Sequence, residues 1–525
     1  MKIAILAPTI APLTSIGGLG DVIRDLSKFL KNKGNDVILI TLDHDNKISN
    51  LKHNIDATMD IKFQGTSLKF NIIKTKHPTT GVDIVGFSNE KINTMDTWDS
   101  LKYELFADLL VNYLDGFQDV DCVSGHDWPC GLAIAKCHEK LDLPTTMTIH
   151  NEAFKGPMKE YKGITMTFLE LGICYSDAFN TVSPTHSEEI KSIGFILDQS
   201  KIKPFHGILN GIDTEEINPG NLVNYVISCS DNKIDPRKLG IFLEDYGIGD
   251  GYIVKPKIKY SWFFNVNNLN KYIEEWNNID KSTITGTDVQ LYGNIKCNDI
   301  NTPLIGFVGR ATYQKGFDII FEAFSQLFEE RNIKLVMLSK GERSIEEKMR
   351  DFAESYSNNV ISLIGHCPPL VPILYGGSDW SIVPSVWEPC GLTQMESMAY
   401  GTPVIAREVG GLKDTIIPLN PDPIVNPNFD RATGVLFKNY DKHGLKWGVE
   451  HALNWTFYRL RDLCLYVTYQ HSNCPDSPYD KNGPLNKFME NCQNHAIRNL
   501  SWQNNNSINK YKGLFGGSIY EHYMR

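Results

Sequence analysis

A pair of basic residues lies in a glycine-bounded loop in the second half of the chain. Arg310 and Lys315 are five residues apart, between Gly309 and Gly316, directly after the apolar run 303–308. Arginine offers a planar fork of donors and lysine a compact charge, and both suit the oxygens of a diphosphate. A solvated surface pair is the alternative. The flanking glycines favour a site for a departing diphosphate.

A carboxylate and a helix start follow a later apolar strand. Glu388 precedes a proline, and the turn after it opens a helix. The first N–H groups of a helix have no intrahelical acceptor, so such a turn can bind phosphate, while a carboxylate can bind hydroxyl groups. The residues of this turn are Cys390, Gly391, Leu392, Thr393 and Gln394.

Polar residues also end two apolar strands in the first half of the chain. His126 and Asp127 follow one strand, and His150 follows the run 145–149. A histidine at a strand end can hydrogen-bond a sugar hydroxyl or a phosphate, although a lone histidine is more often structural. The alternative is that Asp127 caps the next helix and Trp128 packs in the core, and for Trp128 we expect the core.

A glycine-rich turn separates the first strand from the first helix. Gly17, Gly18 and Gly20 precede or flank Asp21 in this turn. Glycines let backbone N–H groups approach a phosphate at a helix N-terminus. A tight turn without a ligand explains such a loop about as often.

Short apolar runs alternate with amphipathic helical patterns, which predicts βαβ units on parallel sheets. The expected strands are 3–7, 36–41, 121–123, 145–149 and 178–182, then 303–308, 333–338, 359–364, 380–383 and 403–405. The chain is therefore predicted to be an α/β protein with two Rossmann-like domains and a ligand cleft between them. Residues from about 221 to 301 interrupt the rhythm and predict an insertion, whose aromatic residues favour a local core over a carbohydrate-stacking surface.

The composition is that of a large globular protein. The chain has 525 residues, a length that exceeds what one hydrophobic core usually serves. Of these residues, 42% are hydrophobic and 22% are charged. A formal net charge of −10 argues against a nucleic-acid partner. No apolar stretch is long enough to span a membrane, and no signal peptide is evident. The 11 cysteines form no CxxC pair, so we expect free thiols and a cytoplasmic location.

Taken in order, the motifs resemble the bacterial glycogen synthases and plant starch synthases. The matching segments are 17–22, 126–128, 149–151, 181–185, 207–213, 309–310, 314–318, 388–394 and 410–412. The resemblance implies a GT-B fold, a retaining glycosyltransferase and no metal or other cofactor. It implies domains at 1–210 and 211–498, the second with the insertion, and a helix in 499–525 that crosses back to the first domain.

The resemblance also assigns roles to individual residues. Arg310 and Lys315 would neutralise the leaving nucleoside diphosphate, and His150 would contact the donor sugar. Glu388 matches the family's acid beside that sugar, with Cys390 next to it. The remaining positions match the phosphate-facing turns or the hinge: Gly17, Gly18, Asp21, Asn210, Gly391, Leu392, Thr393 and Gln394.

The sequence departs from the family pattern at a few positions. Ser15 stands where the family has a lysine, and Val386, Trp387 and Val409 replace the usual residues. The leading hypothesis is transfer of glucose from ADP- or UDP-glucose to an α-1,4-glucan. The alternatives are a specialised transferase with another donor or a small acceptor, and a non-catalytic glycan-binding relative. A metal site at Asp43-His44-Asp45 is a weaker interpretation than a polar loop.

Overall fold

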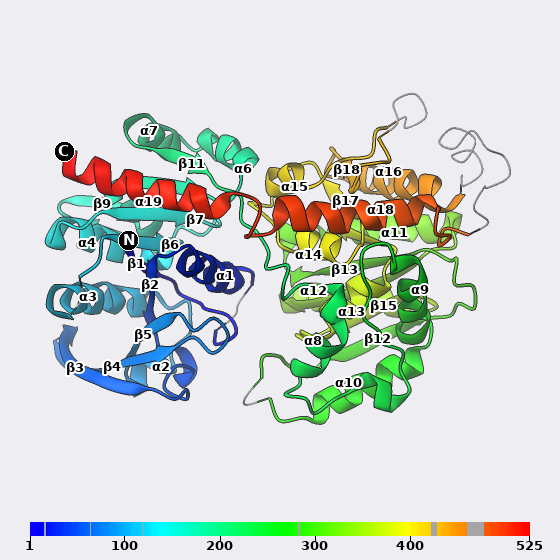
Figure 1. The fold of residues 1–525 in the computed structure, drawn as a ribbon, viewed down its shortest axis with the longest axis horizontal. Coiled ribbons are helices and arrows are strands. Elements are labelled where there is room, and N and C mark those ends of the chain that lie inside the picture. The colour runs from blue at the N-terminus through cyan, green and yellow to red at the C-terminus, as the bar shows by residue number, and fades with distance from the viewer. Residues whose placement is uncertain are drawn as a thin grey trace. The chain divides into compact units, whose positions relative to one another are not determined.

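The chain divides into two compact units. The computed structural model describes residues 1–14, 17–63, 65–117, 119–281, 284–421, 428–458 and 477–524, so Ser15 lies outside the described residues. Unit 1 comprises Met1–Gly211 and Asn505–Arg525, and unit 2 comprises Ile212–Asn504 (Figure 1). The chain leaves unit 1 and returns to it at its end, as expected for a C-terminal helix that crosses back.

Unit 1 is built on a nine-stranded sheet. From one edge to the other the strands are β11 (Phe205–Gly207), β10 (Ala178–Thr181), β7 (Thr145–Ile149), β6 (Cys122–His126), β1 (Lys2–Leu6), β2 (Asp36–Leu42), β5 (Asp83–Ser88), β4 (Thr66–Lys76) and β3 (Asn54–Phe63). The strands from β11 to β5 pair in parallel, whereas β4 and β3 extend the sheet antiparallel. The central strands are apolar and almost wholly buried, which is typical of parallel strands covered on both faces.

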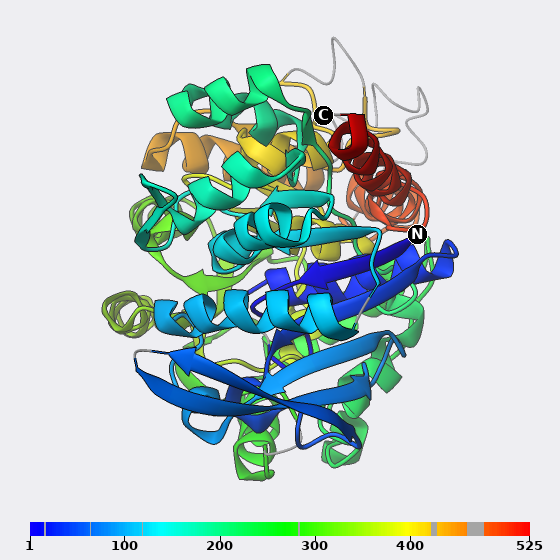
Figure 2. The same ribbon diagram turned by 90° about the vertical axis from the view of Figure 1, so that its left-hand side faces the viewer.

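Helices and a short hairpin complete unit 1. They are α1 (Leu19–Asn32), α2 (Glu90–Asn93), α3 (Ser100–Phe117), α4 (Trp128–Leu141), β8 (Met158–Tyr161), β9 (Ile164–Thr167), α5 (Phe168–Tyr175), α6 (Pro184–Glu189), α7 (Gly194–Ile202) and α19 (Ser507–Met524). In Figure 2, α3 crosses the near side of this unit. The returning helix α19 packs against β6, β7, β10 and α1, and the Ser518 hydroxyl donates a buried 2.9 Å hydrogen bond to the Thr145 carbonyl.

Unit 2 contains a seven-stranded sheet. Its order is β12 (Gln290–Ile295), β15 (Asn359–Ile364), β14 (Lys334–Gly341), β13 (Leu304–Ala311), β16 (Trp380–Val383), β17 (Val404–Arg407) and β18 (Gly434–Phe437). Only β12, at an edge, pairs antiparallel among these strands. The predicted α/β class with two Rossmann-like sheets is therefore confirmed.

The helices of unit 2 cover both faces of this sheet. They are α8 (Leu222–Ser228), α9 (Gly251–Trp262), α10 (Val266–Asn278), α11 (Phe317–Glu330), α12 (Arg343–Ser355), α13 (Leu370–Gly377), α14 (Thr393–Ala399), α15 (Gly410–Thr415), α16 (Lys442–Leu453) and α18 (Pro484–His495). Alternate residues of β14 face different cores, because Leu335 and Met337 belong to one cluster and Val336 and Leu338 to the other.

The segment predicted as an insertion supplies much of the second core. Trp262 and Phe263 are fully buried beside Leu304 and Val336, and the Trp262 indole N–H donates to the Phe242 carbonyl at 2.8 Å. Tyr260, in the same aromatic run, stays exposed. These aromatic residues therefore build a core, as the sequence favoured, and most of the run offers no surface for stacking a sugar.

A buried ion pair anchors the insertion to the sheet. Lys259 on α9 lies 2.7 Å from the Asp379 carboxylate, and both side chains are almost wholly buried. Asp379 also accepts a 2.7 Å hydrogen bond from the Leu304 N–H, and the Tyr479 hydroxyl contacts both charged groups. Because each charge depends on the other inside the core, loss of one leaves an uncompensated buried charge.

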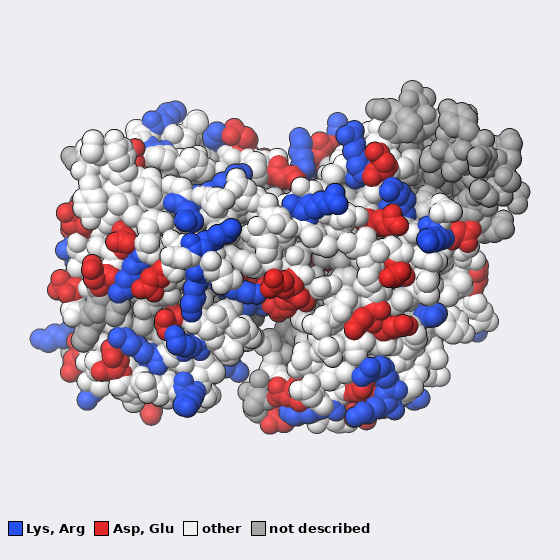
Figure 3. All heavy atoms as spheres, viewed as in Figure 1, with Lys and Arg blue, Asp and Glu red and all other residues white. Residues whose placement is uncertain are grey.

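The visible face of unit 1 carries a mixed distribution of charge. Lys and Arg side chains are interspersed with Asp and Glu, rather than gathered in a basic stripe (Figure 3). Among the described residues, no helix is both long enough and apolar enough to cross a membrane.

We expect Lys259→Met to lower the free energy of unfolding by about 3–5 kcal/mol, because Asp379 would keep a buried charge without its partner. Denaturant unfolding followed by circular dichroism measures the change. Lys257→Met is the matched control on the exposed side of α9 and should change stability by no more than about 0.5 kcal/mol. Equal effects of the two substitutions would contradict an anchoring role for the ion pair.

Candidate active site

Two histidines meet at the carboxyl ends of neighbouring strands in unit 1. His126 ends β6, His150 follows β7, and the two strands pair in parallel. The distance from His126 Nδ1 to His150 Nε2 is 2.8 Å, and the Ser124 hydroxyl lies 3.4 Å from His126 Nε2. The hydrogen bond between the two imidazoles uses His150 Nε2. This leaves His150 Nδ1 for another partner.

Both imidazoles are neutral near pH 7. Burial lowers the pKa of His150 to about 3. Burial, followed by the charge of His150, holds the pKa of His126 well below its ordinary value. A neutral imidazole can hydrogen-bond a hydroxyl but cannot form an ion pair with phosphate. Of the two ligands considered for His150, a sugar hydroxyl is therefore favoured over a phosphate.

Asp127 fixes the backbone that carries His150. Its Oδ1 accepts hydrogen bonds from the N–H groups of His150 at 2.7 Å and Asn151 at 3.2 Å. The residue has a φ of 59°, which is unusual without glycine. Asp127 is the N-cap residue of α4, but its side chain makes no capping hydrogen bond there. Trp128 packs in the core as predicted.

An ion pair holds the loop after His150. His186 on α6 is buried, with Nε2 3.0 Å from Glu152 and Nδ1 3.8 Å from Glu189. Burial opposes the charge on His186, but the two carboxylates outweigh it and raise the pKa to about 9. His186 is therefore a buried cation at neutral pH, and it ties Glu152 to the end of β10.

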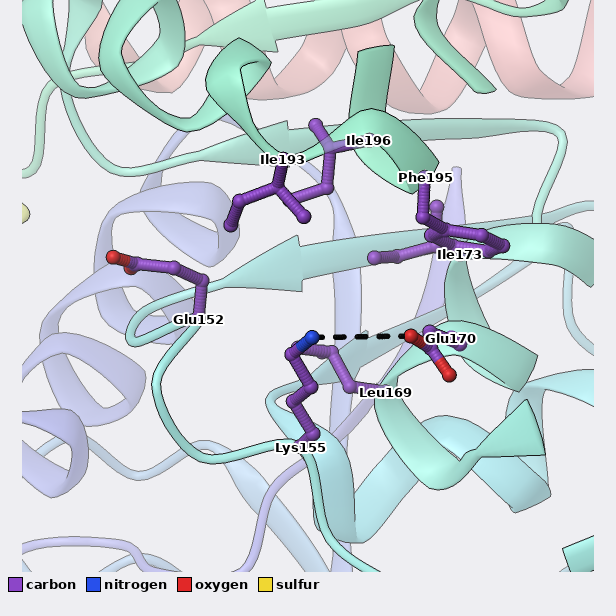
Figure 4. A pocket seen from close by; sticks show the side chains of 8 residues that line it. All are labelled: Glu152, Lys155, Leu169, Glu170, Ile173, Ile193, Phe195 and Ile196. Atoms are coloured by element: carbon purple, nitrogen blue, oxygen red, sulfur yellow. Dashed lines mark ion pairs between the residues drawn. The ribbon is translucent and has the colours of Figure 1, made fainter. Parts of the chain in front are cut away.

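A pocket lies beside the same loop. Figure 4 shows Glu152 and Lys155 on one side and apolar side chains of α5 and α7 on the other, with Lys155 Nζ 3.9 Å from Glu170. Its walls are mainly apolar, as Ile173 and Ile196 illustrate. Because Lys155 faces Glu170 and the rest of the wall is mainly apolar, we assign no sugar to this pocket.

The glycine-rich turn of unit 1 begins α1 as predicted. Gly17 has a φ of 78°, which favours glycine, and Gly18 is the N-cap without a side-chain capping bond. Asp21 in the first turn lies 3.4 Å from Arg24. Near the end of unit 1, Asn210 is buried, and its Oδ1 has no hydrogen-bond partner among the described residues.

The short segment considered as a weaker metal site forms a 3-10 helical turn (His44–Asn46) with polar contacts inside the fold. Asp43 Oδ1 accepts the N–H of Ile48 at 2.7 Å, and His44 Nδ1 lies 3.0 Å from Lys102 Nζ. These contacts use the polar groups within the fold.

In unit 2, the structure pairs two of the predicted catalytic residues. Lys315 Nζ lies 2.5 Å from Glu388 Oε2, and both side chains are largely buried. The Ser385 hydroxyl donates to the same oxygen at 2.9 Å. An anion that reaches Lys315 must therefore compete with Glu388 for its charge.

Backbone contacts bring these two loops together. The Val386 N–H donates to the Gln314 carbonyl at 2.8 Å, and Gln314 Nε2 donates to the Trp387 carbonyl at 3.0 Å. Gly316 has a φ of 75°, and a Cβ there would lie 2.2 Å from the Pro384 carbonyl oxygen. The glycine thus permits the approach that places Lys315 beside Glu388.

Arg310 lies at the carboxyl end of β13, four residues before Gln314. Its side chain is exposed and has no ion-pair or hydrogen-bond partner among the residues that the structure describes. An exposed guanidinium without an internal partner remains available for an external anion.

The turn from Cys390 to Gln394 is tightly built. Gly391 has a φ of 76°, and the Gln394 side chain donates to the carbonyls of Cys390 and Gly391 at 2.9 and 2.8 Å. Leu392 is the N-cap of α14 and gives no side-chain capping bond, so the following N–H groups, beginning at Thr393, are not capped by a side chain. Cys390 is buried.

The structure therefore joins Lys315 with Glu388 in unit 2, and His150 with His126 in unit 1. The sequence placed His126 among the polar residues at strand ends but did not predict its contact with His150, and it did not predict Ser385 as a site residue. The contact could have been found, because the strand that His126 ends is next to the strand that precedes His150. Ser385 gave no such signal, since its contact depends on the path of the loop.

Comparisons with known proteins now identify the family. The starch synthase catalytic domain model matches residues 2–199, and the model of glycosyl transferases group 1 matches residues 296–461. A probable glycogen synthase from Methanocaldococcus jannaschii is 56% identical over 525 residues, 100% of both chains. The chain belongs to the glycogen synthase family. Another family member, the glycogen synthase of Kosmotoga olearia, is 28% identical and matches over 86% of this chain and 90% of its own.

Solved structures show the fold of this glycogen synthase family member. The catalytic domain of starch synthase IV from Arabidopsis thaliana has a TM-score of 0.74 at 22% identity and covers 99% of both chains. A sucrose-phosphate synthase from Thermosynechococcus elongatus has a TM-score of 0.57 at 14% identity and covers 98% of both. The chain is thus a glycosyltransferase with the GT-B fold, as predicted.

In this family member, the buried His186 cation predicts a pH-dependent stability. Its pKa is about 9 when folded and about 6.5 when unfolded, so its contribution is complete below pH 6.5 and is lost as the pH rises through 9. We expect the wild type to lose up to roughly 3 kcal/mol over this window relative to His186→Asn. Urea unfolding at several pH values measures the difference.

The exposed His443 provides a control, because His443→Asn should keep the wild-type pH profile. If His186→Asn and wild type lost stability in parallel between pH 6.5 and 9, the buried cation would be refuted.

Proposed function

We propose that this chain transfers glucose from ADP- or UDP-glucose to the non-reducing end of an α-1,4-glucan, with retention of the anomeric configuration. Its family membership supports glycosyl transfer, and the relative with 56% identity is named a probable glycogen synthase. The starch synthase IV structure was solved bound to ADP and acarbose, which favours a nucleoside diphosphate as the leaving group here.

The Lys315–Glu388 ion pair is the observation that carries this proposal. When the bond between the sugar and the diphosphate breaks, negative charge grows on the departing phosphate oxygens. Lys315 can turn from Glu388 toward that charge, and the exposed Arg310 can add a second cation. Fixed charges aimed at a developing anion are among the largest contributions to catalysis.

The other site residues take roles that fit their chemistry. His150, neutral and held through its Nε2, donates or accepts a hydrogen bond at the donor sugar. Glu388, once Lys315 turns to phosphate, can accept hydroxyl groups of that sugar. The N–H groups at Leu392, Thr393 and Gln394 face the phosphates.

Positive charge from side chains takes the place that a metal has in other transferases. We therefore propose that the transfer step needs no metal cofactor. We also infer a cytoplasmic location, because the cysteines that the structure describes, such as the buried Cys122 and Cys137, are free thiols.

We expect Lys315→Ala to lower kcat by roughly 100-fold or more, since it removes a cation from the departing diphosphate and leaves Glu388 unpaired. Arg310→Ala should lower kcat/KM with less effect on folding, because Arg310 is exposed. Steady-state kinetics with each variant measure both effects. Arg343, an exposed cation of the same unit paired with Glu347, is the control, and Arg343→Ala should keep wild-type rates.

The decisive experiment supplies ADP-, UDP- and GDP-glucose with and without glycogen, in the presence and absence of EDTA. We expect glucan elongation with ADP- or UDP-glucose, α-linked product, and the same initial rate with EDTA. Transfer only to a small acceptor would establish a specialised transferase instead. A rate that falls with EDTA and returns with Mg²⁺ or Mn²⁺ would overturn the roles of Arg310 and Lys315.

A further inference from the structure

Two histidines and an aspartate converge in unit 1 near the amino end of β10. This is the opposite end of the strands from His126 and His150. His138 lies in the last turn of α4, Asp177 directly precedes β10, and His522 lies near the end of α19. One nitrogen of each imidazole and one oxygen of Asp177 all lie within 4.8 Å of one another. Three segments far apart in the sequence thus bring typical metal ligands together.

The hydrogen bonds of His522 determine how its ring is used. Its Nε2 lies 3.0 Å from the Asp142 carbonyl oxygen, which can only accept, so Nε2 carries a hydrogen. Its Nδ1 faces both oxygens of Asp177, at 3.3 and 3.4 Å. This arrangement is the one that metal-bound histidines adopt, with one nitrogen on the metal and the other donating to a carbonyl.

His138 faces the same carboxylate. Its Nδ1 lies 3.6 Å from Asp177 Oδ2 and is buried without a hydrogen-bond partner among the described residues. The two imidazole rings lie edge to face, with centroids 5.3 Å apart. The His138 nitrogen and the Asp177 oxygen are too far apart for a hydrogen bond, so a ligand bound between them would give both atoms a partner.

Asp177 is held in place by the backbone. The Thr145 N–H donates to Oδ2 at 2.8 Å, and this bond orients the carboxylate. The carboxylate is thus positioned between the two imidazoles before any ion binds.

The distances match a tetrahedral ion better than direct hydrogen bonds. Bonds of 2.0–2.2 Å from zinc to nitrogen or oxygen place neighbouring ligands roughly 3.3–3.5 Å apart. The observed separations from Asp177 Oδ2 are 3.3 Å to His522 and 3.6 Å to His138, whereas charge-assisted hydrogen bonds measure about 2.7–2.9 Å. Nitrogen and carboxylate ligands of this kind favour zinc among the common metals.

We propose that His138, Asp177 and His522 bind a zinc-class divalent ion, with a water as the fourth ligand, that fastens α19 to unit 1. His522 comes from the returning helix, and the other two ligands come from the body of the unit. The ion would therefore link α19 to the last turn of α4 and to the start of β10. It lies at the strand ends away from His126 and His150, so it contributes stability and takes no part in glucosyl transfer.

The test measures metal binding by the full chain. The purified protein is stripped with a chelator, dialysed and titrated with Zn²⁺, and the bound metal is counted by mass spectrometry. We expect one tightly held zinc per chain, and a rise in Tm of about 2 °C or more when zinc is restored. Binding and the Tm rise should disappear in His138→Ala and in His522→Ala.

His443→Ala is the matched control, since this exposed histidine lies outside the cluster. It should bind zinc like the wild type. X-ray absorption of the zinc-loaded wild type gives a readout that does not depend on variants, which covers the case in which one of them fails to fold. We expect a first shell of nitrogen and oxygen at about 2.0–2.1 Å that includes imidazole.

Several outcomes would overturn this site. One is a wild type that binds no zinc, even if His522→Ala is less stable, because the cluster would then be a simple ion pair. Another is a sulfur shell at about 2.3 Å, which would place the metal on cysteines. The stripped chain should keep its initial transfer rate below its unfolding temperature, so failure of the metal site and failure of the proposed function are separable.

Discussion

Parallel pairing of strands is the constraint on which the site depends. In a parallel sheet all carboxyl ends reach one edge, so residues that follow neighbouring strands are brought close whatever their separation in sequence. The pairing of β6 with β7 brings His126 to His150, and it lets the Asp127 carboxylate bind the backbone of the next strand end. In unit 2, β13 and β16 are neighbours, and their following loops bring Lys315 to Glu388.

The two units offer different chemistry at these edges. In unit 1, burial keeps His126 and His150 neutral, and neutral imidazoles are able to hydrogen-bond hydroxyl groups. In unit 2, Lys315 pairs with Glu388, and the Arg310 side chain is exposed. Each kind of side chain suits a different kind of group, a hydroxyl for the imidazoles and a phosphate for the cations.

The sequence predicted the buried parallel strands well and the sheet edges poorly. Runs such as 145–149 are apolar throughout, because both faces of the strand are covered, and the structure places β7 at the same residues. The antiparallel strands β3 and β4 were not predicted, since solvent on one face leaves many of their residues polar. The residue types of the site were predicted, but the contact between Lys315 and Glu388, which spans 73 positions, depends on the loop path through Gly316.

The return of the chain to unit 1 has a consequence for biosynthesis. When Gly211 leaves the ribosome, β6, β7 and β10 exist but α19, which packs on them, has not been made. At about 5–20 residues per second, the interval before Asn505 emerges is roughly 15–60 s. Unit 2 is complete before unit 1, so the nascent chain must carry an uncovered apolar surface while its second half is translated. The first domain to begin folding is the last to finish.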